Sequence, residues 1–230
     1  MAQMIMKRNT KGDVESVILK DVTLFYTCIQ SPRAIYDDRN VAYEKARKEF
    51  TVDVAGLSED DCDTWDEIFG KQPSKKHSNE KFRSHYKLED NDELPDPNGK
   101  KQYTLKLGQK AQNNAGEPIS EKMVPRVLMV EGGKAQDITF TTLIGNGSKG
   151  DVMVRCMKND YGQFSYLYRV KVTELVEFAS GNNADELEFL GVDEVELAEM
   201  PKKAAQEPAK ESKKAEEPVK EDPDFDDTDF

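Results

Sequence analysis

The chain contains few of the residues on which catalytic and metal sites are built. It has 2 histidines and 3 cysteines among 230 residues. The cysteines (Cys28, Cys62 and Cys156) have no paired spacing, and neither His77 nor His85 completes a ligand pattern with them, which argues against structural zinc. We expect reduced thiols that are buried or half-buried.

No sequence pattern typical of an enzyme is present either. The two histidines lie in a lysine-rich segment without a partner to hold them as a base, and there is no phosphate-binding loop of the type GxxxxGK[ST]. The segment IGNGSKG at 144–150 has a different spacing and precedes a strand, so we interpret it as a turn. We therefore expect no catalytic residues, no cofactor and no metal.

Long apolar runs are also missing. No run approaches the roughly 20 residues that a membrane-spanning helix needs, and the chain shows no signal-peptide pattern. These absences predict a soluble protein that stays inside the cell and has no membrane partner.

The chain as a whole lacks positive charge, because its formal net charge is −12. Residues 181–230 hold 17 of the 45 acidic and 6 of the 33 basic residues, which leaves residues 1–180 with a net charge of −1. Within that part, residues 71–111 hold 10 basic and 6 acidic residues, and residues 145–171 hold 5 and 2. A neutral body with such basic strips can bind a polyanion, although ordinary solvated surface is the alternative.

The last ten residues, EDPDFDDTDF, combine six carboxylates with two phenylalanines and no basic residue. Such a segment has no core to enter, so we expect a domain at 1–180 followed by a disordered linker and acidic tail at 181–230. The tail offers an aromatic anchor and acidic flanks to a basic receptor, either on another protein or on this one. Its predicted partner-binding residues are Asp224, Phe225, Asp226, Asp227, Asp229 and Phe230.

The body is predicted to be mainly β. A long, bent strand is expected at 14–29, and Ser58 is a good N-cap for a helix that ends at Gly70. A short helix is expected at 40–50 and little regular structure at 71–101. The other expected strands are 50–55, a pair at 102–112 and 124–130, a short strand from 138, a strand to Met157 and a last strand from 162 to 178.

Five principal strands with one main α-helix and elaborated loops favour a five-stranded OB-fold barrel. The helix is expected between the second and third strands, whereas the common OB-fold places it between the third and fourth. An open α+β sheet is therefore the alternative.

Rings and cations in the body favour binding of single-stranded nucleic acid, because rings stack on unpaired bases while cations follow the backbone. Tyr168, next to the valines of the last strand, is expected in the core. For Tyr161, Phe164 and Tyr166, base stacking and core packing remain equally open. The candidate DNA-binding residues are Arg33, Tyr36, Lys106, Lys110, Arg155, Lys158, Tyr161, Phe164 and Tyr166.

The ending Asp229-Phe230 resembles the tails of tailed-phage single-stranded DNA-binding proteins of the replication type. Three features of the body are similar to that family as well. They are Pro32-Arg33 followed by a tyrosine, the Gly-Ser-Lys turn at 144–149 before a strand, and the segment ELVEF at 174–178 before the tail.

The resemblance implies an OB-fold that coats unwound DNA without sequence preference in phage replication, recombination and repair, in the cytoplasm of the infected bacterial host. It implies Arg33 as a DNA contact, and a tail that recruits polymerase or helicase–primase and is related to a possible homodimer. The alternative is an acidic-tailed protein-interaction adaptor or DNA mimic that does not itself bind DNA.

Overall fold

The structure is a computed structural model that describes residues 2–113 and 115–176, so the predicted tail lies outside the described residues. The described part is mainly β, with nine strands in one sheet. The strands are β1 (Gln3–Arg8), β2 (Val14–Ala34), β3 (Lys48–Ala55), β4 (Lys75–Ser78), β5 (Lys101–Lys110), β6 (Arg126–Glu131), β7 (Lys134–Asp137), β8 (Ser148–Asn159) and β9 (Gly162–Glu174).

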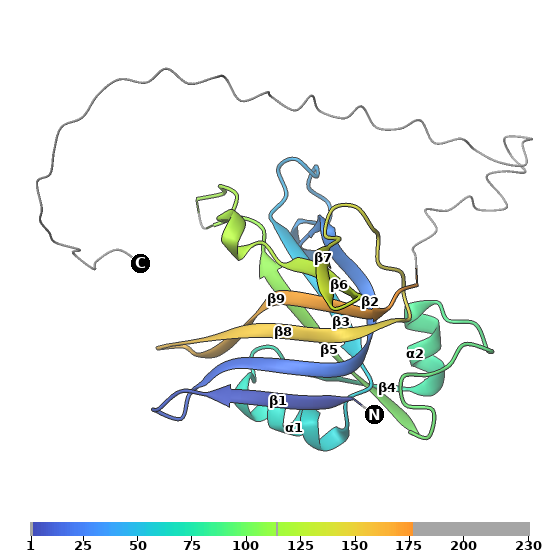
Figure 1. Cartoon of the computed structure of the whole chain (residues 1–230). Coiled ribbons are helices and arrows are strands. Elements are labelled where there is room, and N and C mark those ends of the chain that lie inside the picture. The colour runs from blue at the N-terminus through green and yellow to red at the C-terminus, as the bar shows by residue number, and fades with distance from the viewer. Residues whose placement is uncertain (1, 114, 177–230) are drawn as a thin grey trace, which may run out of the picture. The chain divides into compact units, whose positions relative to one another are not determined.

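Five of these strands, β2, β3, β5, β8 and β9, have the connections of an OB-fold barrel. Strand β2 pairs with both β3 and β8, β3 pairs with β5, β8 pairs with β9, and β5 approaches β9. Figure 1 shows β1, β2, β8 and β9 side by side, with β3 and β5 crossing behind them. The prediction of a mainly β, OB-like fold is confirmed, with extra strands added at the sheet edges.

Two α-helices accompany the sheet, α1 (Glu59–Ile68) and α2 (Asn79–Tyr86), and there are short 3-10 turns at Tyr36–Asp38 and Glu121–Met123. Helix α1 begins as predicted, because the Ser58 hydroxyl accepts from the backbone N–H of Asp61. It buries Trp65 in the main core. In the sequence, α1 lies between β3 and β5, the second and third strands of the barrel. None of the helices in the described ranges is long and apolar enough to cross a membrane.

The long strand β2 bends, as predicted, and a turn supports the bend, but the strand continues through Ser31 and Pro32 to Ala34, beyond its predicted end at residue 29. Tyr26 has a φ of 45°, and its backbone N–H donates to Asn146 Oδ1 at 2.8 Å. The N–H of Gly147 donates to the carbonyl of Leu24 at 3.0 Å. The IGNGSKG segment is therefore a turn that holds the bent strand in place, which agrees with its interpretation from sequence.

Several predicted elements are wrong. Residues 40–47 form turns instead of a helix, because Arg47 closes this loop by binding Asp38 through its backbone N–H (2.8 Å) and its guanidinium (2.9 Å). Strands β5 and β6 do not pair with each other; β6 instead runs parallel to β9. The short strand expected from residue 138 is a turn, and the segment expected to lack structure contains β4 and α2.

Candidate nucleic-acid interface

A groove of about 590 Å³ lies where the barrel closes, between β5 and β9. Here the side chain of Gln72 takes the place of a neighbouring strand for β9. Its Oε1 accepts from the Ser165 N–H at 2.8 Å and from the Ser165 hydroxyl at 3.0 Å, and its Nε2 donates to the Ser165 carbonyl at 3.0 Å. The backbone polar groups of Ser165 are thus satisfied while the seam of the barrel stays hollow.

One wall of the groove is cationic. Lys106 and Lys110 lie on the outer face of β5, with Gly108 between them, because alternate residues of a strand share a face. Lys71 also lines the groove, from the segment before β4, and Lys75 lines it as the first residue of β4. Among the described residues that line the groove, Glu49 is the only acidic one.

The other wall is aromatic because β9 contains a β-bulge. Met153 pairs with Arg169 but Val154 pairs with Leu167, so Tyr168 is an extra residue. As a result, Leu167 and Val170 are both buried although they are three residues apart. The prediction that Tyr168 lies in the core is wrong: it is half-buried on the outer face, and its ring lies 3.7 Å from Arg155 Cζ and 4.0 Å from Arg169 Cζ.

The bulge places Phe164 and Tyr166 on the same outer side. Lys71 Nζ lies 5.5 Å from the ring centres of both Tyr161 and Phe164, and Tyr161 is 77% exposed. We call Tyr161, Phe164, Tyr166 and Tyr168 the surface rings. Cation contacts of this kind keep a ring oriented at the surface without burying it.

A second hollow of about 420 Å³ adjoins the groove. Its lining includes Met123, Met157 and Cys156 together with Arg155, and both hollows share Tyr166 and Gln109. Burial raises the pKa of the Cys156 thiol to about 12. An apolar hollow next to a cationic groove can hold a flat, weakly polar group whose attached chain is anionic.

The structure brings together most of the predicted DNA-binding residues. Lys106, Lys110, Phe164 and Tyr166 line the groove, and Arg155 lines the second hollow. Arg33 reaches the groove through Glu49, since its Nε lies 3.6 Å from Glu49 Oε1. Tyr161 joins them through its contact with Lys71.

Four predicted DNA-binding residues line neither hollow; Arg33 and Tyr161 contact groove residues, whereas Tyr36 and Lys158 make other contacts. Tyr36 is 74% exposed in the loop after β2, where Arg39 Cζ lies 4.0 Å from its ring centre. Lys158 Nζ is 2.7 Å from Asp13 Oδ1, and this contact lowers the pKa of Asp13. The predicted tail residues, Asp224 to Phe230, lie outside the described residues.

Sequence reasoning missed Lys71, Lys75, Gln72 and Glu49 as groove residues. The two lysines belong to a basic strip that was recognised as such, but a count of charges does not say which lysines share a surface. Nothing in the sequence near Gln72 indicates that its amide replaces a strand, because that role depends on where β9 lies.

A second group of rings has a different environment. Phe25, Phe82 and Tyr86, which we call the buried rings, lie between β2 and α2 with ring centres 4.4 to 5.4 Å apart and exposures of 2% or less. The Tyr86 hydroxyl donates to Asp53 Oδ2 at 3.2 Å. Burial raises the pKa of both Tyr86 and Asp53.

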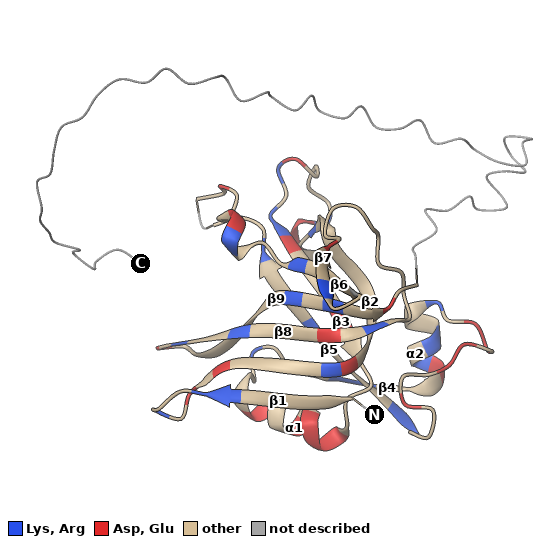
Figure 2. Ribbon diagram, in the orientation of Figure 1, with Lys and Arg blue, Asp and Glu red and all other residues tan. Residues whose placement is uncertain are grey.

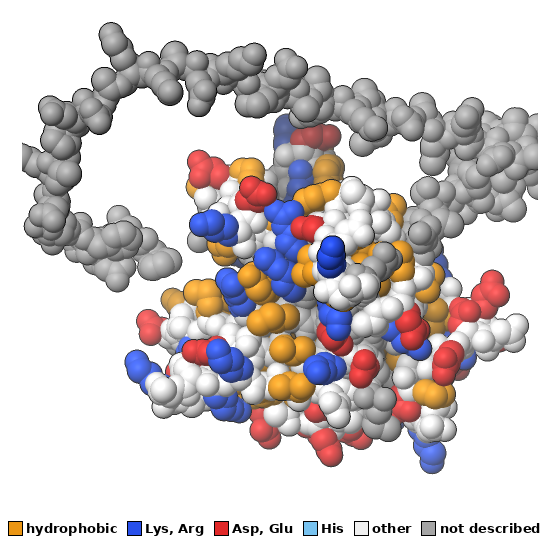
Figure 3. Space-filling view, in the orientation of Figure 1, with side chains coloured by type: hydrophobic (Ala, Val, Ile, Leu, Met, Phe, Trp, Pro, Cys, Tyr) orange, Lys and Arg blue, Asp and Glu red, His pale blue; other side chains and the backbone are white. Residues whose placement is uncertain are grey.

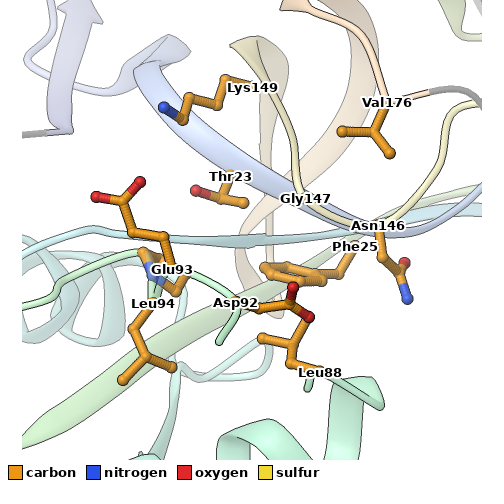
Figure 4. A pocket seen from close by; sticks show the side chains of 11 residues that line it. Thr23, Phe25, Leu88, Asp92, Glu93, Leu94, Asn146, Gly147, Lys149 and Val176 are labelled. Carbon is orange, nitrogen blue, oxygen red and sulfur yellow. The ribbon is translucent and has the colours of Figure 1, made fainter. Parts of the chain in front are cut away.

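A hollow of about 340 Å³ beside these rings differs in charge from the groove. Figure 4 shows the carboxylates of Asp92 and Glu93 and the ammonium of Lys149 among the side chains around it, with Phe25. The presence of two carboxylates makes it a poor site for a polyanion. Among the described residues, no group of three or more His, Cys, Asp or Glu side chains could hold a metal ion.

The outer face of the sheet adjoins the second hollow, because Arg169 on this face contacts Tyr168 in the lining of that hollow. Ile5, Ile18, Met153, Arg169 and Arg126 lie in register across β1, β2, β8, β9 and β6. Figure 3 shows hydrophobic side chains along the middle of this face with basic ones beside them, and Figure 2 shows basic residues on β6 and β9. Arg126 forms ion pairs with Glu121 at 2.9 Å and with Asp137 at 3.6 Å, so it is less available to a phosphate than the groove lysines.

No family model and no curated protein matches the chain. Among solved structures, the single-stranded DNA-binding protein from bacteriophage Enc34 in complex with ssDNA is 13% identical, with a TM-score of 0.39 over 77% of this chain and 99% of that chain. The single-stranded DNA-binding protein gp2.5 of bacteriophage T7 is 18% identical, with a TM-score of 0.41 over 73% and 96%. At this level of similarity, no residue role is transferred from those proteins to this chain.

Proposed function

We propose that this chain is a non-enzymatic protein that binds single-stranded DNA without sequence preference. The observation that carries the proposal is the groove at the barrel seam, which has lysines on one wall and rings on the other. Lysines track a phosphate backbone, and rings stack on bases of any sequence. The two walls therefore match the two chemically different parts of unpaired DNA, its phosphate backbone and its bases.

The arrangement favours unpaired over paired DNA. Side chains at alternate positions of a strand are about 7 Å apart, which is roughly twice the 3.4 Å spacing of stacked bases. Phe164 and Tyr166 are spaced in this way along β9. Successive bases can reach such rings only when the strand is unstacked and extended, a state that a duplex does not offer.

The proposal extends to the role of the protein in the cell. We propose that it coats unwound DNA during phage replication, recombination and repair in the cytoplasm of the host, and that the acidic tail docks on polymerase or helicase–primase. The composition of EDPDFDDTDF supports the tail's part, because carboxylates and an aromatic anchor suit a basic receptor. A homodimer is part of this proposal.

The test is a titration of the purified full-length chain with an oligothymidine and with a duplex of equal length, at several salt concentrations. Because the groove offers three to five phosphate contacts, log affinity for the oligothymidine should fall against log salt with a slope of roughly −2 to −4. The single strand should bind clearly more tightly than the duplex. Equal binding of both, or no binding at low salt, would overturn the proposal in favour of an acidic-tailed adaptor.

A further inference from the structure

One carboxylate lies among the cations of the groove. Glu49 Oε1 lies 2.5 Å from Lys106 Nζ and 3.6 Å from Arg33 Nε. The sheet register places Glu49 opposite Arg33 on β2 and opposite Lys110 on β5. Arg33 and Lys106 thus bind one acidic side chain from the two neighbouring strands, and Lys110 lies across from it.

The burial of these groups strengthens their interaction. The Glu49 side chain is 20% exposed, whereas Arg33 and Lys106 are 41% and 39% exposed. The carboxylate is therefore the most shielded member of the group, and the two cations reach over it towards solvent. Partly shielded pairs are screened by salt less than fully exposed pairs.

The place that Glu49 occupies suits a phosphate. A carboxylate and a phosphodiester each carry one negative charge over two oxygens, and both accept charge-assisted hydrogen bonds from arginine and lysine. Lys71 and Lys75, which also line the groove, belong to none of the salt bridges among the described residues, so they can meet a backbone directly. Arg33 and Lys106 must first release Glu49.

We infer that Glu49 is a built-in competitor of the DNA backbone. It holds Arg33 and Lys106 when the groove is empty, and a phosphate must displace it to gain these two contacts. Glu49 thereby weakens binding and lowers its dependence on salt, which keeps a coating protein easy to remove. The inference rests on the proposed function and adds a residue that limits affinity at the same site.

The test compares Glu49→Gln with wild type in oligothymidine titrations across salt. Glutamine keeps the size of the side chain but not its charge, so binding at low salt should tighten roughly two- to fivefold, the size expected for losing one half-exposed ion pair. Because one more phosphate is neutralised, the slope of log affinity against log salt should become steeper by about 0.7. A thermal melt of each variant checks that the fold is intact.

The matched control is Glu174→Gln. Glu174 forms a comparable pair with Lys149 at 3.2 Å, but it is 69% exposed and does not line the groove. Both variants change the net charge of the chain by the same amount. Glu174→Gln should leave affinity and slope unchanged, and a similar gain in both variants would attribute the effect to net charge and overturn the inference.

A second arm uses Lys106→Gln. If Glu49 competes through Lys106, the gain from Glu49→Gln should shrink in the Lys106→Gln background. If Glu49→Gln instead binds more weakly than wild type, Glu49 positions the cations for DNA and the inference is wrong. If wild type binds but Glu49→Gln behaves identically, the inference alone fails. A wild-type chain that does not bind at all overturns the proposed function together with it.

Discussion

The buried rings and the surface rings are built from the same residue types but have different neighbours. Phe25, Phe82 and Tyr86 contact one another and are closed off from solvent by α2. Three of the surface rings, Tyr161, Phe164 and Tyr168, instead meet lysine or arginine side chains at the groove and the second hollow. The partner of a ring is therefore a better guide to its role than its residue type. Rings that pack against other rings stabilise the fold, whereas rings beside cations remain accessible to a ligand.

The largest expected effect is on stability, at the buried rings. Phe82 is fully buried, and Phe82→Ala removes its contacts with both Phe25 and Tyr86. We expect the free energy of unfolding to fall by about 3–5 kcal/mol, measured by chemical denaturation. The fraction that remains folded should bind oligothymidine as wild type does. Reduced binding by that folded fraction would place α2 in the interface.

The next effect is on binding, at the surface rings. Phe164→Ala should weaken oligothymidine binding by about 1–3 kcal/mol, because one base loses its stacking partner, with little change in stability. Phe140→Ala is the matched control. Phe140 is 56% exposed and also has a cation, Arg126, 5.5 Å from its ring centre, but it lines neither hollow. Equal losses in the two variants would show that exposure of a ring, and not its place in the groove, decides binding.

A smaller effect is expected for single cations. Lys110→Gln removes one groove cation, so the slope of log affinity against log salt should become shallower by about 0.7. Lys158→Gln is the comparison, since Lys158 is paired with Asp13 outside both hollows, and its slope should match wild type. A shallower slope for Lys158→Gln would extend the interface to the part of β8 where Lys158 meets Asp13.

The smallest effect is expected on the pH dependence of stability, at Asp53, which accepts a hydrogen bond from Tyr86. Burial raises the pKa of Asp53 in the fold, so the folded state binds this proton more tightly than the unfolded chain. Stability then decreases as pH rises from the ordinary value of 3.8 through the raised value. Asp53→Asn should therefore unfold at a slightly higher denaturant concentration than wild type at pH 7, and the difference should vanish below pH 3.8.

Asp38 provides a control of opposite sign for that measurement. Its hydrogen bonds with Arg47 lower the pKa of Asp38 to about 2. The stabilisation of the fold by ionised Asp38 is therefore present above pH 3.8 and is lost as the pH falls towards 2. Asp38→Asn should thus reduce stability at pH 7 and cease to do so in acid. Parallel pH profiles for the two variants would contradict one of the two assignments, and the direction of the shared profile would show which.

The parts of the fold that sequence predicted are those with local causes. The cap at Ser58, the long strand β2 and the turn before β8 depend on neighbouring residues, and the structure confirms them. Helix α2 was missed although it has a similar cap at Ser78 and apolar side chains at Phe82 and Tyr86, one helical turn apart. The lysines and prolines around it obscured that signal.

The parts that failed depend on distant residues. The parallel pairing of β6 with β9 joins segments about 40 residues apart, and the bulge at Tyr168 is visible only once β8 is in register with β9. For the site, sequence identified the residue types and several correct members. It could not show that Lys71 and Gln72 lie against β9, because the barrel seam that unites them is a tertiary feature.

The extra residue in β9 has a consequence for how such a surface can arise. Without the bulge, strict alternation would put Phe164 and Tyr166 on the same side as Val170 and Val172, which face the core. The bulge reverses the alternation within β9, so Phe164 and Tyr166 face outward although they have the same spacing as the valines that face the core. One extra residue therefore lets a single strand present rings to a ligand along its first half and valines to the core along its second half.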